Sequence, residues 1–177
     1  MKRVYGLVAI SIFFVSCSPA QAPAPAAGAS ATKPYGSLAQ VMRGIPFPNS
    51  NIIFDTQTTD PAAAQKPAEG TSASSQFSGV YGGWQAVENA AIALQETANL
   101  ITIPGRKCDN GRDVPVNQDD FKKWAQGLQE AGAAAYKAAQ SKNMDQMVEV
   151  SGTVADACAA CHEKYRDKED LKMRCIP

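Results

Sequence analysis

Apolar residues recur every three or four positions along most of the chain after residue 36, which is the spacing of one helix face. Three long stretches show this pattern: about Gly83 to Ile101, Asn117 to about Ser141, and a third that begins at Asn143. Asn117 and Asn143 are expected to cap the helices that follow them, because a short polar side chain can accept a hydrogen bond from a first-turn amide. No stretch alternates with period two, so the pattern predicts an all-α chain.

A shorter helical pattern begins at Ser37, the expected N-cap, and reaches Gly44. Pro46 and Pro48 follow, and proline breaks a helix because it lacks the amide hydrogen and its ring clashes with the preceding turn. A second helical piece through Phe54 is expected beyond this break. Together with the three longer helices, these pieces predict a four-helix bundle with a broken first helix.

Two stretches lack the large apolar residues that a core requires. Residues 18–34 are dominated by alanine and proline, a composition typical of an extended tether. Residues 58–76 are small and polar, and a loop is expected there. The bundle is therefore expected to form one domain within residues 37–177.

The N-terminus has the pattern of an export signal. Lys2 and Arg3 precede an apolar run from Val4 to Val15, which is too short for a permanent membrane span. Residues 1–16 are therefore predicted to be a signal peptide.

The sequence FFVSC resembles a bacterial lipoprotein cleavage site, so Cys17 is expected to become a lipidated N-terminus with a tether over residues 17–36. Ordinary signal-peptide cleavage after Ala20 is the alternative. Both alternatives predict export to the periplasm, an oxidising space. A lipid is then the only expected attachment to the membrane.

Charge and motif content exclude several classes of function. Lys plus Arg and Asp plus Glu each number 17, so there is no basic excess of the kind that marks a nucleic-acid-binding protein. We find no paired carboxylates, no nucleophile with a base and no phosphate-binding loop, and the sequence therefore predicts a protein that is not an enzyme.

The single histidine of the chain ends the motif CAACH, which runs from Cys158 to His162. Structural zinc needs four protein ligands, and apart from this motif the chain has only two cysteines outside the signal region and no other histidine, so zinc is not expected. A redox-active cysteine pair is expected at a helix start after a strand, whereas this pair lies inside a helix. Two thiols three residues apart can instead form thioethers with one haem c while the adjacent imidazole binds its iron. The motif therefore predicts one covalent haem held by Cys158, Cys161 and His162.

A CAACH motif on the last helix, only 15 residues from the end of the chain, resembles the class II c-type cytochromes. These are the cytochrome c′ family and its low-spin relatives, which are four-helix bundles. The family typically carries a basic residue four positions after the histidine, and Arg166 stands there. The resemblance implies that Arg166 contacts a haem propionate and that two copies can pair as a homodimer. The broken first helix departs from the family, which usually has one long helix there.

Met42 is the candidate for the distal side of the haem. Met147 lies 15 residues before His162 on the same helix, about 22 Å away, and cannot reach the iron. Met42 lies on the first helix, where low-spin members of the family carry an axial methionine. A His/Met iron suits an electron carrier that meets redox partner proteins. If Met42 only fills the core, an open distal site would favour binding of nitric oxide or carbon monoxide.

Cys108 and Cys175 are the two cysteines that remain. In an oxidising space they are expected to form a disulfide between the loop after the second bundle helix and the C-terminal tail, and two free thiols are the alternative.

Overall fold

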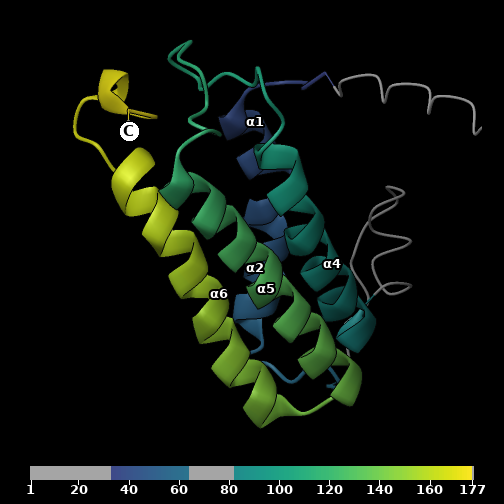
Figure 1. The fold of residues 1–177 in the computed structure, drawn as a ribbon. Helices are drawn as coiled ribbons and strands as arrows, with labels where there is room; N and C mark the ends of the chain where they lie inside the picture. Colours follow the sequence, from purple (N-terminus) through teal and green to yellow (C-terminus); the bar gives the residue numbers. More distant parts are fainter. Residues whose placement is uncertain (1–32, 64–81, 177) are drawn as a thin grey trace, which may run out of the picture. The chain divides into compact units, whose positions relative to one another are not determined.

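The chain folds into a bundle of α-helices, and the computed structural model describes residues 33–63 and 82–176 (Figure 1). The expected signal peptide, Cys17 and most of the expected tether lie outside the described residues, as does most of the polar stretch 58–76. The described helices are α1 (Leu38–Gly44), α2 (Pro46–Asp55), α4 (Gly83–Ile101), α5 (Asp119–Ser141) and α6 (Met144–Tyr165), followed by the short 3-10 helix η1 (Leu171–Met173). These residues contain no strand, only an isolated bridge between Lys107 and Asp113.

Contacts between helices close the bundle into a ring. Helix α4 packs against α5, α5 against α6, and α2 against both α4 and α6. In Figure 1, α4, α5 and α6 run side by side, and α1 and α2 lie behind them. The predicted all-α four-helix bundle is confirmed, with α1 and α2 together taking the place of its first helix.

The break in the first helix lies where the prolines predict it. Ile45 ends α1 and precedes α2, whose first residue is Pro46. A proline is tolerated in the first turn because an amide at that position has no partner within the helix. At the other end of α1, Ser37 accepts a hydrogen bond from the Gln40 amide, and the Gln40 side chain accepts one from the Ser37 amide. The predicted cap at Ser37 is thus confirmed as a reciprocal capping box.

One predicted cap is correct and another is wrong. The Asn143 side chain accepts a 3.0 Å hydrogen bond from the Gln146 amide at the start of α6, as expected. Asn117 does not cap α5, because that helix begins at Asp119 with Gln118 at its N-cap and no side-chain hydrogen bond. The two aspartates of the first turn of α5 instead place negative charge near the positive end of the helix dipole.

No helix within residues 33–63 or 82–176 combines the length and the apolar character that crossing a membrane requires.

Candidate functional site

A cavity of about 890 Å³ lies beside the last turns of α6. Its walls come from α1, α2, the end of α4, the first half of α5, the end of α6 and the C-terminal tail. Cys158, Cys161 and His162 all line it, as does Met42. Ligand sites typically enclose about 300–1,000 Å³, so the cavity is large enough for a cofactor.

Both clusters of the buried core border the cavity, the first through Leu128 and the second through several residues that include Phe121 and Tyr165. Cys158 packs against the cluster that includes Leu94 and Val154. Cys161 packs against the other, which includes Phe121 and Tyr165. Protein interiors contain few voids larger than a water molecule. An apolar group inserted here would therefore join the two halves of the core.

His162 has the protonation state that an iron ligand needs. Its side chain is half-buried on the cavity wall. Burial is the main cause that lowers the pKa of His162, and the positive charge of Arg166 lowers it further. The imidazole is therefore neutral at pH 7, and one ring nitrogen keeps a free electron pair for a metal.

The two thiols of the motif do not resemble a reactive cysteine pair. Cys158 and Cys161 are both half-buried and are not disulfide-bonded among the described residues. Burial raises the pKa of the Cys161 thiol to about 11 and also raises that of Cys158. Thiol–disulfide exchange needs a lowered pKa instead.

The described residues also contain no group of three or more His, Cys, Asp or Glu side chains placed to hold a metal ion.

A polar network behind the motif was not predicted from the sequence. The Tyr165 hydroxyl donates a 2.7 Å hydrogen bond to Asp120 in the first turn of α5, and Lys164 pairs with the same carboxylate. The Tyr165 ring is buried and makes edge contacts with Phe121 and Trp124, with centroids 5.7 and 5.8 Å apart. These contacts fix the end of α6, and no local motif joins residues so far apart in the sequence.

Met42 reaches the cavity from the first helix. Its half-buried side chain packs against the same core cluster as Cys161. Phe47 and Phe54 of α2 line the cavity as well, and Phe47 is largely exposed. The structure thus brings Met42 and His162 to one cavity from two different helices.

Arg166 lies on the cavity wall, but its guanidinium has a partner. Its Nε and Nη2 atoms donate hydrogen bonds of 2.7 and 3.3 Å to the Asp167 carboxylate. Contact between Arg166 and a haem propionate stays a prediction.

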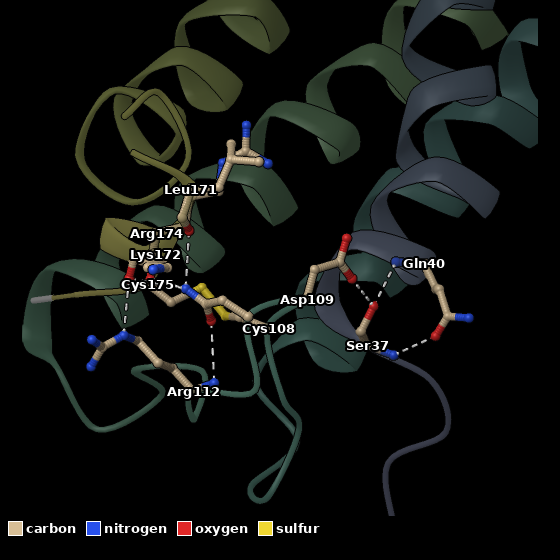
Figure 2. The surroundings of a disulfide bond; sticks show 10 residues. Ser37, Gln40, Cys108, Asp109, Arg112, Leu171, Lys172, Arg174 and Cys175 are labelled. Carbon is tan, nitrogen blue, oxygen red and sulfur yellow. Dashed lines mark hydrogen bonds between the residues drawn. A yellow bond between two sulfur atoms is a disulfide. The ribbon is translucent and has the colours of Figure 1, made fainter. Parts of the chain in front are cut away.

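A disulfide joins Cys108 to Cys175, the pairing expected from the sequence (Figure 2). Beside it, the Asn110 side chain donates hydrogen bonds to three carbonyl groups of the tail, those of Leu171, Lys172 and Arg174. The loop after α4 therefore holds the tail as one wall of the cavity.

Residues 84–166 match the family model described as Cytochrome C'. This part of the chain belongs to the cytochrome c′ family. No curated protein and no solved structure matches the chain. The family binds haem c and consists generally of electron-transfer or ligand-binding proteins, and the match supports a class II c-type cytochrome. The match spans α4, α5 and α6, including the CAACH motif, and does not reach Met42 on α1.

Proposed function

We propose that this cytochrome is a one-electron carrier that holds a single haem c through thioethers to Cys158 and Cys161, with His162 bound to the iron. The observation that carries the proposal is the cavity bordered by both clusters of the core, which all three residues line. Bound there, the iron would supply a reversible Fe(III)/Fe(II) couple. The protein's own contribution is to bind the group, bury it and keep its surroundings fixed.

We also propose that the Met42 sulfur would be the second protein ligand of the iron. The helix that carries it is firmly anchored at its N-terminal end, where the Leu38 amide donates a 2.8 Å hydrogen bond to the Lys107 carbonyl. The buried Arg106 guanidinium holds the preceding segment through the carbonyl groups of Tyr35 and Gly36. A ligand on so well anchored an element keeps its position when the iron changes charge. A thioether ligand also raises the potential, which suits electron transfer.

The N-terminal sequence supports a cellular location for this function. An export signal followed by Cys17 favours a periplasmic protein attached to the membrane by lipid alone. We propose that it exchanges electrons there with redox partner proteins. Pairing into a homodimer stays a prediction.

Absorption spectroscopy and a haem stain test the proposal on protein produced by export in a bacterium that attaches haem c. The denatured protein is expected to retain haem, and the reduced native protein is expected to bind carbon monoxide slowly or not at all. Met42→Leu keeps an apolar side chain but removes the ligand, so it should form the carbonyl adduct rapidly. Met173→Leu changes an exposed methionine and is the matched control, expected to behave like the unmodified protein.

Each alternative has its own outcome. Rapid carbonyl formation in the unmodified protein would exclude Met42 as a ligand and favour a gas-binding function. Absence of haem from the denatured protein would exclude covalent attachment.

A further inference from the structure

Arg174, in the tail after α6, carries a buried atom that lacks a partner. Within the described part of the chain, its Nε is a buried side-chain nitrogen with no hydrogen-bond acceptor. Buried polar atoms are nearly always paired, and an unpaired donor on a cationic group is particularly costly. The guanidinium of Arg174 is therefore incompletely paired within the described residues.

Neighbouring contacts fix the position of Arg174 on the cavity wall. Its carbonyl accepts a 3.0 Å hydrogen bond from Asn110, and the next residue, Cys175, is held by the disulfide to Cys108 (Figure 2). The Cys175 amide in turn donates a 2.9 Å hydrogen bond to the Tyr165 carbonyl. The backbone of Arg174 is thus anchored on both sides, and the residue lines the same cavity as the CAACH motif.

The other two arginines of the cavity already have acidic partners. Arg43 pairs with Asp109 at 3.5 Å, and Arg166 pairs with Asp167 at 2.7 Å. None of the ion pairs in residues 33–63 and 82–176 involves Arg174. Among these three arginines, Arg174 is therefore the one still available to an incoming anion.

We propose that Arg174 donates hydrogen bonds to a propionate carboxylate of the haem in this cavity. The inference rests on the proposed haem binding. A guanidinium is the side chain best matched to a carboxylate, because its planar N–H groups can donate to both oxygens. The disulfide between Cys108 and Cys175 would then hold this arginine at the cofactor. A cation at that place favours the reduced iron, which carries one positive charge fewer.

The test compares reduction potentials of haem-loaded protein at pH 7 for Arg174→Gln, Arg174→Lys and the control Lys107→Gln, which lies outside the cavity lining. Arg174→Gln removes the charge and is expected to lower the ratio of reduced to oxidised protein at a fixed solution potential by about tenfold. Arg174→Lys keeps the charge and is expected to recover most of this loss. Lys107→Gln removes an exposed cation that already pairs with Asp113, and a change of less than threefold is expected.

A crystal structure of the haem-loaded unmodified protein decides the matter even if the variants fail to fold. Arg174 is expected within hydrogen-bond distance of a propionate. The proposal is overturned if the propionates contact only other cations, or if Arg174→Gln leaves the reduced fraction unchanged. Either result would leave the proposed electron carrier intact, whereas a protein that holds no haem would refute the proposed function itself.

Discussion

The Tyr165 hydroxyl donates a 2.7 Å hydrogen bond to Oδ1 of Asp120, which ties the last turn of α6 to the first turn of α5. The two residues are 45 positions apart in the chain. Tyr165 follows His162 by less than one turn of α6. The orientation of the histidine on the cavity wall therefore depends on a contact that only the packed bundle creates.

Removal of this hydroxyl is expected to destabilise the protein. Tyr165→Phe keeps the buried ring and its edge contacts with Phe121 and Trp124 but deletes the donor. The loss of one hydrogen bond should lower the free energy of unfolding by about 1 kcal/mol. Urea unfolding followed by circular dichroism measures this free energy. Tyr136→Phe is the control, because Tyr136 is a half-buried tyrosine of α5. Equal stability of the two variants would show that the Tyr165 hydrogen bond contributes nothing.

The same network is expected to make the stability of the protein depend on pH. Hydrogen bonds from Lys164 and then from Tyr165 lower the pKa of Asp120 below its ordinary value. A carboxyl group whose pKa is lower in the folded protein contributes stability above its unfolded pKa, about 3.9, and loses it as pH falls through the folded pKa.

Unfolding measured between pH 2 and pH 6 checks this expectation. Asp120→Asn should flatten the loss of stability on the acid side. Asp119→Asn makes the same change one residue away, where the carboxylate is fully exposed and pairs with Lys122 at 3.5 Å. Identical acid profiles for Asp120→Asn and the unmodified protein would contradict the prediction.

Loss of the disulfide between Cys108 and Cys175 is expected to cost more than any single hydrogen bond. The bond closes a loop with a sequence separation of 67 residues, for which the chain-entropy model gives about 4 kcal/mol. Cys108→Ala combined with Cys175→Ala should lower the urea midpoint accordingly. Reduced unmodified protein is the control, since it loses the bond but keeps both buried side chains. A loss below about 1 kcal/mol would mean that hydrogen bonds to the tail, such as those of Asn110, hold it without the disulfide.

Gly132 is expected to resist even the smallest side chain, because α5 and α4 approach each other closely there. A Cβ atom at Gly132 would lie 3.0 Å from the Gln95 amide nitrogen and 3.1 Å from the Ala91 carbonyl oxygen. Overpacking of this kind costs about 1–3 kcal/mol, which outweighs the gain of up to about 1 kcal/mol from replacing a helical glycine. Gly132→Ala should therefore destabilise the bundle.

Gly127 in the same helix provides the matched control. A Cβ atom there would have no neighbour within 4 Å, so Gly127→Ala should stabilise the protein. Thermal unfolding of both variants gives the comparison. The packing argument fails if Gly132→Ala has the same melting temperature as Gly127→Ala, or a higher one.

The sequence by itself determined the local features of this cytochrome. The apolar period predicted the helices, Pro46 and Pro48 predicted the break in the first one, and Ser37 and Asn143 were correctly predicted as caps, because each of these depends on residues within one or two turns. The N-cap of α5 was predicted one residue early, since Asn117 and Gln118 differ too little in local preference to fix a boundary.

The tertiary structure alone decided which distant residues share the site. It brought Met42 and Arg174 to the cavity that the CAACH motif lines, and it joined Tyr165 to Asp120 across two helices. Periodicity shows that a helix has an apolar face but does not show which partner that face meets. That choice depends on how all the helices pack at once around the cavity, and so it is a property of the whole bundle rather than of any one segment.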